Sequence, residues 1–124
     1  MKQVFELLPT YLQEALKRQG IVEPTDVQTG MLPPALSGKD VLATAQTGTG
    51  KTLAFLLPLL VQLEKNPSDH ALILSPTREL AEQTYEEILK LQDDEHPLKP
   101  ALIIGGDNIH KQFADLRKKP RIVV

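Results

Sequence analysis

The chain has 124 residues, of which 41% are hydrophobic and 24% are charged, and its formal net charge is −2. The composition is that of an ordinary globular protein, and the length suffices for one domain but not for two. The slight negative charge gives no general attraction for nucleic acid, and the absence of cysteine excludes a disulfide framework and a thiolate metal site.

The first predicted element is a helix over residues 9–19. Thr10 is placed to cap it, apolar residues recur on one face, and Gly20 ends it. The start of the chain has no apolar core of a secretory signal. The longest apolar run, residues 53–61, is far shorter than the ~20 residues that span a membrane. The sequence therefore predicts a cytoplasmic protein.

A turn over residues 21–26 leads into a second predicted helix. Thr25 or Asp26 is expected to cap this helix, and the pair Pro33-Pro34 is expected to bend or shorten it. We expect residues 1–38 to form a helical region and residues 39–124 to form an α/β core.

Residues 39–124 alternate short apolar runs with helical patterns. The expected strands are residues 41–45, 71–75, 101–104 and 122–124. The expected helices are residues 52–64, 78–91 and 108–118, the last capped by Asp107 or Asn108. Apolar strands that alternate with helices indicate a parallel sheet covered on both faces, so the fold class is α/β. Because the chain stops inside the last apolar run, we expect it to be part of a longer protein.

A glycine-rich loop lies between the first of these strands and its helix. It fits the phosphate-binding pattern Gly/Ala-x-x-x-x-Gly-Lys-Ser/Thr. Its residues are Ala45, Gln46, Thr47, Gly48, Thr49, Gly50, Lys51 and Thr52. Glycines let backbone N–H groups wrap around phosphate oxygens, and the following helix points its positive end at the anion. Lys51 is expected at the β- and γ-phosphates and Thr52 at Mg²⁺. The alternative is a Gly-Thr loop with a surface lysine.

Three further segments resemble those of DEAD-box RNA helicases. Residues 20–28 (GIVEPTDVQ) are similar to the family's Q motif, and residues 76–81 (PTRELA) match its motif Ia letter for letter. The pair Gly105-Gly106 matches the family's GG element. With the phosphate loop, these segments stand in the family's order. The resemblance implies that residues 1–124 are the N-terminal part of the first RecA-like domain, a partial α/β domain that stops before the acidic Asp-Glu-Ala-Asp strand.

The resemblance assigns adenine recognition to Gln28. A side-chain amide offers a donor and an acceptor, which suits N7 and N6 of adenine and selects ATP over GTP. A solvent-exposed helix glutamine is the alternative. Phe5 matches the isolated aromatic residue that covers the base in the family, with a core phenylalanine as the alternative. Ile21 departs from the family, which usually has an aromatic residue there, and this predicts weaker adenine binding.

The resemblance also implies contacts to an RNA backbone. Pro76, Thr77 and Arg78 would contribute through the start of their helix, and Gly105 and Gly106 would let a sugar-phosphate chain approach. The alternatives are a solvated Arg78, a helix-capping Thr77 and a plain glycine turn. We expect the basic run at residues 117–119 to be the solvated end of a helix, stabilised by the helix dipole.

Phosphoryl transfer needs an acidic residue that holds Mg²⁺ and positions water, and such a residue normally follows an apolar strand. No predicted strand is followed by one, and no Asp-Glu-Ala-Asp segment is present. We therefore expect this chain to bind ATP without hydrolysing it at a helicase rate. An uncovered sheet edge is expected to promote self-association.

Two other functions compete with this interpretation. A small P-loop kinase would need an acceptor-binding lid and an acidic base, and the sequence has neither. A non-catalytic P-loop nucleotide-binding module that ends naturally at residue 124 stays open as the alternative.

Overall fold

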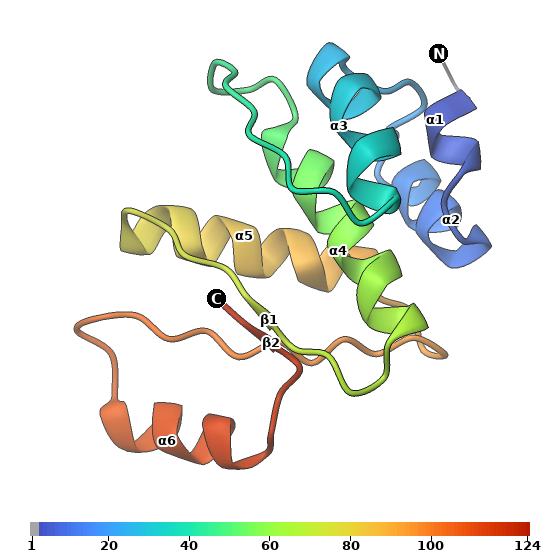
Figure 1. The fold of residues 1–124 in the computed structure, drawn as a ribbon. Coiled ribbons are helices and arrows are strands. Elements are labelled where there is room, and N and C mark those ends of the chain that lie inside the picture. Colours follow the sequence, from blue (N-terminus) through green and yellow to red (C-terminus); the bar gives the residue numbers. More distant parts are fainter. Residues whose placement is uncertain (1–2) are drawn as a thin grey trace. The chain divides into compact units, whose positions relative to one another are not determined.

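The computed structural model describes residues 3–124. The chain divides into two compact units, Met1–Pro67 and Ser68–Val124. The first unit holds the helices α1 (Gln3–Glu6), α2 (Thr10–Arg18), α3 (Asp26–Leu36) and α4 (Lys51–Lys65) (Figure 1). The second holds β1 (Ala71–Leu72), α5 (Arg78–Leu91), α6 (Ile109–Arg117) and β2 (Ile122–Val123). The division into a helical region and an α/β core after residue 38 stays a prediction.

The first unit is built around α4. Eight of its fifteen residues are buried, including Leu56 and Leu57, which are fully enclosed. Helix α3 packs along α4 and contributes Leu32, which is also fully buried. Removal of this apolar surface from water stabilises the unit by about 25 cal/mol for each Å² buried. The packing fixes the start of α4, which is the end of the phosphate loop.

Two details of the first unit differ from the prediction. Thr10 is the first residue of α2 and does not cap it; Pro9 holds the cap position and makes no side-chain cap bond. Proline suits the start of a helix because the backbone N–H that it lacks would have no partner within the helix. Helix α3 is capped by Thr25, as one of the two expected residues, and it continues through Pro33 and Pro34 to Leu36. The prolines therefore do not end it.

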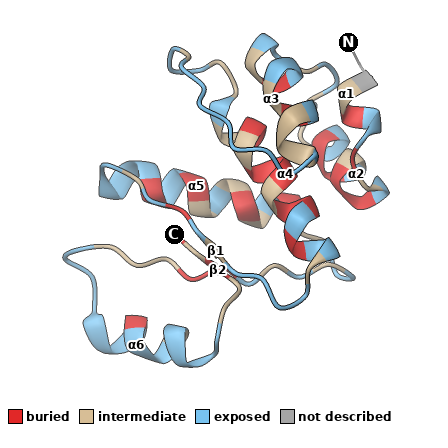
Figure 2. Cartoon of the chain, in the orientation of Figure 1, coloured by how far each residue is buried: buried red, intermediate tan, exposed pale blue. Residues whose placement is uncertain are grey.

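The strand that we predict over residues 41–45 is wrong. This segment has no regular secondary structure, and the chain before α4 is drawn mostly in the colour of exposed residues (Figure 2). Leu42 is 98% exposed. A β-strand needs hydrogen bonds to a neighbouring strand. Among residues 3–124, the sheet has two strands and neither pairs with this segment. The apolar composition of the segment is therefore not matched by burial.

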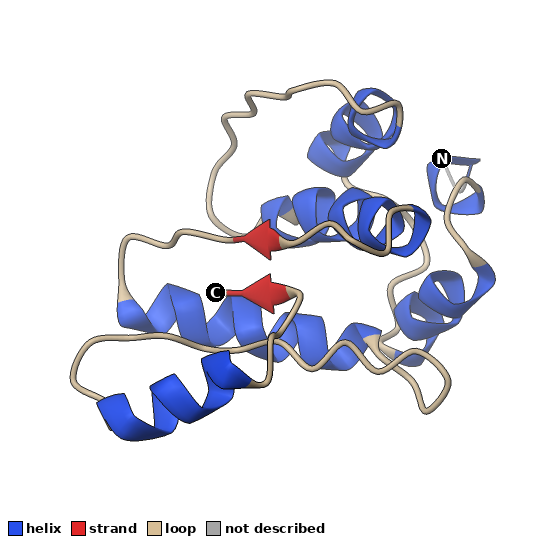
Figure 3. Cartoon of the chain, turned by 60° about the horizontal axis from the view of Figure 1, so that its bottom comes forward, coloured by secondary structure: helices blue, strands red, loops and turns tan. Residues whose placement is uncertain are grey.

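The second unit contains a small parallel sheet in which β2 is central. The two strands lie side by side (Figure 3). Ala71 of β1 pairs with Ile122, and Val123 forms a bridge to Ala101 on the other side. The backbone N–H of Val124 donates to the oxygen of Ala101 at 2.8 Å. The last strand in the sequence thus lies between two earlier segments. The expected strands at 71–75 and 122–124 are present in shorter form, and the strand expected at 101–104 is reduced to a single bridge at Ala101.

Two helices flank this sheet on opposite sides (Figure 1). Helix α5 has the predicted bounds and buries Ala81, Thr84, Ile88 and Leu91 at helical spacing. Helix α6 is capped by Asn108, which accepts hydrogen bonds from two backbone N–H groups of its first turn. The predicted α/β class is confirmed. Across residues 3–124, no helix is both long and apolar enough to cross a membrane.

A carboxylate organises the turn that follows α5. Asp93 Oδ1 accepts hydrogen bonds from the backbone N–H groups of Glu95 at 3.0 Å and of His96 at 2.7 Å, and it lies 2.9 Å from His96 Nδ1. The side-chain bond to His96 is the main cause that lowers the pKa of Asp93. Hydrogen bonds to an ionised carboxylate favour its charged form.

We predict that Asp93 stabilises the folded chain only while it is ionised. Its pKa is lower in the folded state, so its contribution is present above the unfolded pKa, about 3.9, and is lost as the pH falls through the folded pKa. The variant Asp93→Asn should be less stable than the parent at pH 7, and the difference should disappear in acid. Urea denaturation between pH 2 and 7 measures this. A difference that is independent of pH would contradict the prediction.

Candidate functional site

The phosphate loop carries its two glycines in a conformation that other residues rarely adopt. Gly48 and Gly50 both have φ of 84°, in the left-handed region that favours glycine. Gly50 is the residue that caps α4, and its carbonyl accepts the first helical bond from the N–H of Ala54 at 3.1 Å. The loop therefore delivers the chain into α4 with the unpaired N–H groups of the helix start available to an anion.

Two side chains of the loop bond to its own backbone. Lys51 Nζ donates to the oxygen of Ala45 at 2.6 Å, and Thr49 Oγ1 donates to the oxygen of Gln46 at 2.6 Å. The first of these bonds joins the two ends of the glycine-rich segment. The Lys51 ammonium thus lies over the loop, and it is exposed to solvent. The ammonium group can leave the neutral carbonyl oxygen of Ala45 and donate to a charged phosphate oxygen instead, because the charged oxygen is the stronger acceptor.

Gln28 connects the segment before α3 to the phosphate loop. Its side chain is 2% exposed. Oε1 accepts the backbone N–H of Thr25 at 2.9 Å, and Nε2 donates to the oxygen of Gly50 at 3.2 Å. Thr25 Oγ1 accepts the backbone N–H of Gln28 at 3.4 Å, so the two residues form a reciprocal capping box. The solvent-exposed alternative for Gln28 is wrong.

Glycine is required at position 50 for a second reason. A Cβ atom there would lie 2.5 Å from Gln28 Nε2 and 3.0 Å from Thr25 Oγ1. At Gly48, which has the same φ, a Cβ would meet nothing within 4 Å. The side-chain amide of Gln28 therefore occupies the space that the absent side chain of Gly50 leaves open.

The predicted aromatic residue lies within the first unit. Phe5 belongs to α1 and is 7% exposed. It borders a cavity of about 280 Å³ that is also lined by Leu16, Ile21 and Val22. The aliphatic side chain of Ile21 thus lies beside the same cavity as the aromatic ring.

The second unit brings motif Ia and the paired glycines into contact. Arg78 Nη1 donates to the oxygen of Gly105 at 3.1 Å. Gly106 has φ of 81°, and a Cβ there would lie 2.5 Å from Arg78 Nη1. Thr77 caps α5 by accepting the N–H of Leu80 at 3.2 Å, and Pro76 precedes it on the exposed turn. Arg78 is exposed, so its remaining guanidinium donors face solvent.

Sequence reasoning missed a residue that supports this second group. Gln112 of α6 is 7% exposed, and its Nε2 donates to the oxygen of Ile104 at 2.8 Å, directly before the paired glycines. A buried polar side chain at the centre of a helix gives no local pattern that would identify it. The residue fixes the chain that carries Gly105 and Gly106.

The sequence and the fold of this chain are similar to those of known proteins. The DEAD/DEAH box helicase family matches residues 25–124 of this chain. The chain belongs to this family. Its match includes the capping box, the phosphate loop, motif Ia and the paired glycines.

Relatives and solved structures agree with this assignment. The ATP-dependent RNA helicase CshA of Limosilactobacillus reuteri is 46% identical over 114 residues, which are 91% of this chain and 23% of that protein. A DEAD box protein from Methanococcus jannaschii superposes with a TM-score of 0.85 and 39% identity, over 94% of this chain and 32% of that one. Prp28 from Chaetomium thermophilum, solved bound to ADP, gives a TM-score of 0.83 and 41% identity, over 94% of this chain and 30% of that one. The RecA-like fold class is confirmed, and the chain spans about a quarter of the length of the first relative.

We predict different costs for alanine at the two loop glycines. Both substitutions force a side chain into positive φ, at a cost of roughly 1–2 kcal/mol. Gly50→Ala should lower the free energy of unfolding by about 1 kcal/mol more than Gly48→Ala does, because Gln28 must give up its hydrogen bond to the oxygen of Gly50. Thermal denaturation of the two variants measures this difference, with Gly48→Ala as the matched control for strain. Equal destabilisation would contradict the packing described.

Proposed function

We propose that this chain is the ATP-binding part of an RNA helicase. The observation that carries the proposal is the buried Gln28 amide, which joins the Q-type segment to the phosphate loop at Gly50. Relatives that match over nine tenths of the chain are ATP-dependent RNA helicases. The whole protein would couple ATP hydrolysis to the separation of RNA duplexes. Its predicted location is cytoplasmic.

The phosphate loop would hold the nucleotide's phosphates. The backbone N–H groups of the loop would bind the phosphate oxygens, together with the N–H groups at the start of α4. The loop residues concerned are Ala45, Gln46, Thr47, Gly48, Thr49 and Gly50. The Lys51 ammonium would leave the oxygen of Ala45 and neutralise the β- and γ-phosphates. The Thr52 hydroxyl would bind Mg²⁺, which offsets the remaining phosphate charge.

The Gln28 amide retains the groups that adenine needs. An amide oxygen can accept two hydrogen bonds and an amide nitrogen can donate two. Thr25 and Gly50 each use one of these. One acceptor and one donor are left, which suit N6 and N7 of adenine. Because the side chain is 2% exposed, the segment that covers it would have to move as the base enters. Phe5 would cover the base from α1.

The second unit would contact the RNA backbone. Arg78 is tied to Gly105 by one hydrogen bond and has further donors for phosphate oxygens. Thr77 and Pro76 lead into the start of α5, whose N–H groups favour an anion. The absence of side chains at Gly105 and Gly106 would allow a sugar-phosphate chain to lie against the backbone.

Residues 1–124 would bind ATP without hydrolysing it at a helicase rate. The strand β1 leads to Ser75, and the segment that pairs at Ala101 leads to the paired glycines. No carboxylate therefore follows either segment directly to hold Mg²⁺ or orient water.

We predict that Lys51→Ala lowers the affinity for ATP at least about tenfold and leaves the affinity for AMP unchanged, because AMP lacks the phosphates that Lys51 would neutralise. Calorimetry with ATP, GTP and AMP tests it, with Lys39→Ala in the preceding turn as the control. ATP should bind more tightly than GTP. Equal affinity of the parent and Lys51→Ala for ATP would overturn the assignment. Hydrolysis stimulated by RNA would overturn the non-catalytic part of it.

A separate proposal is self-association through the edge of β1 that faces away from β2, which pairs with no strand among residues 3–124. Ala71 and Ile73 donate to the β2 side, so Leu72 between them turns its N–H toward the opposite edge. Leu72 is 68% exposed and Leu74 is 84% exposed. Uncovered apolar edges pair with other chains.

Light scattering at rising concentration should show a mass above that of one chain, and Leu72→Lys should restore the monomer. The matched control is Leu7→Lys, at an exposed leucine of the first unit. A strictly monomeric parent chain at high concentration would exclude the proposal.

A further inference from the structure

Two Lys-Pro pairs stand directly before neighbouring strands of the second unit. Lys99-Pro100 precedes the segment that pairs at Ala101, and Lys119-Pro120 precedes β2 after one more residue. Lys99 has φ of 43° and Lys119 has φ of 55°. Within residues 3–124, these two lysines are the non-glycine residues with positive φ. Residues before proline normally adopt extended backbone, so both positions are strained.

Helix termination explains part of one of these conformations. Lys119 follows the last residues of α6, and its N–H donates to the oxygen of Leu116 at 3.0 Å, as in a left-handed helix cap. Glycine is the residue usually found there. Lys99 follows no helix, so no cap accounts for it. A lysine at both places is therefore unexplained by the local backbone.

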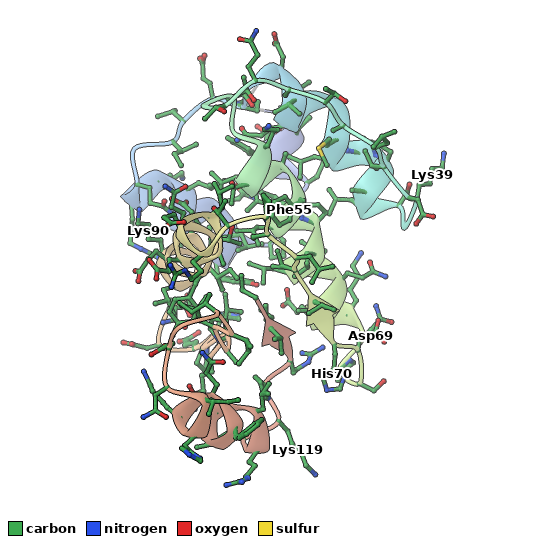
Figure 4. All side chains as sticks on the ribbon, turned by 90° about the vertical axis from the view of Figure 1, so that its left-hand side faces the viewer. Lys39, Phe55, Asp69, His70, Lys90 and Lys119 are labelled. Carbon is green, nitrogen blue, oxygen red and sulfur yellow. The ribbon has the colours of Figure 1, made fainter. Side chains whose placement is uncertain are left out.

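The sheet brings the two lysines to one cavity. The two strands are parallel and adjacent, so the residues before them meet at the same sheet edge. Both Lys-Pro pairs line a cavity of about 590 Å³, which lies wholly within the second unit. Its size is that of a small-molecule site. Figure 4 shows Lys119 beside the end of α6.

The cavity is basic although the chain as a whole is acidic. Five cationic side chains line it: Lys99, Lys111, Lys118, Lys119 and Arg121. The two acidic side chains that line it, Asp107 and Asp115, each already interact with a neighbouring residue. Asp115 lies 3.7 Å from Lys118, and Asp107 accepts the N–H of Asn108 at 2.8 Å.

Three of the cations have no counterion. Among residues 3–124, the ammonium groups of Lys99, Lys111 and Lys119 form no hydrogen bond or ion pair. The helix dipole accounts for cations in the last turn of α6, but Lys99 lies outside any helix and Lys111 lies in the first turn. Like charges gathered in one concavity raise the local concentration of anions.

We propose that this cavity binds a phosphate-bearing ligand of nucleotide size, held by Lys99, Lys111 and Lys119. Phosphate accepts several charge-assisted hydrogen bonds at once, which suits three separate ammonium groups. The phosphate belongs either to a free nucleotide or to an RNA chain. The site is distinct from the phosphate loop, which lies in the first unit, and it does not depend on the function proposed for that loop.

The test uses residue-specific amide signals in NMR spectra of the whole chain at constant ionic strength. Inorganic phosphate, uridine monophosphate and a uridine hexanucleotide are added separately. Saturable shifts at Lys99, Ala101, Lys119 and Arg121 are expected, whatever happens at Gly48 and Gly50. Shifts with uridine monophosphate support a free nucleotide, and shifts with the hexanucleotide alone support RNA.

The variant Lys119→Gly separates binding from folding. Glycine tolerates positive φ, so the variant should fold at least as well as the parent, while it loses one ammonium group. Affinity for the bound ligand should fall about tenfold. Lys39→Gln removes the same charge outside the cavity and should have no effect. Absence of saturable shifts at the cavity, or equal affinity in Lys119→Gly, would overturn the proposal.

Discussion

The phosphate loop of the first unit depends on the two hydrogen bonds of the buried Gln28 side-chain amide. This amide accepts the N–H of Thr25 and donates to the oxygen of Gly50, and so joins the cap of α3 to the cap of α4. The amide fills the place where a Cβ on Gly50 would lie, so glycine and glutamine fit each other sterically. A buried amide without partners is costly, so the two hydrogen bonds of Gln28 favour the conformation in which Gly50 has its left-handed φ.

This arrangement gives one side chain two tasks. The bonds to Thr25 and Gly50 shape the phosphate loop, and the unused donor and acceptor are those that adenine would pair with. Base recognition and phosphate binding would therefore act on the same few atoms. In the second unit, Arg78 plays a similar structural part, since its bond to Gly105 holds motif Ia against the paired glycines. In both units, the family's motifs contact one another through direct hydrogen bonds between protein groups.

The sequence predicted helices better than strands, and the reason is physical. Helix α5 has the predicted bounds because its periodicity and its cap Thr77 are local signals. Residues 41–45 are apolar, yet a strand requires a partner that local sequence does not supply. The motifs gave the candidate site residues, but not that Gln28 reaches Gly50, 22 positions away. The positive φ of Lys99 and Lys119 had no local signal, because glycine normally marks such positions.

The most direct test of this account observes the Gln28 side-chain amide by NMR in ¹⁵N-labelled protein. Addition of ADP should shift both Gln28 side-chain N–H signals together with the backbone amides of Gly48 and Gly50, because one residue serves the base and the loop. GDP at the same concentration should shift the loop amides and leave the Gln28 side chain largely unchanged. If saturating ADP shifts the loop amides while the Gln28 side-chain signals stay in place, the central role of this residue is contradicted.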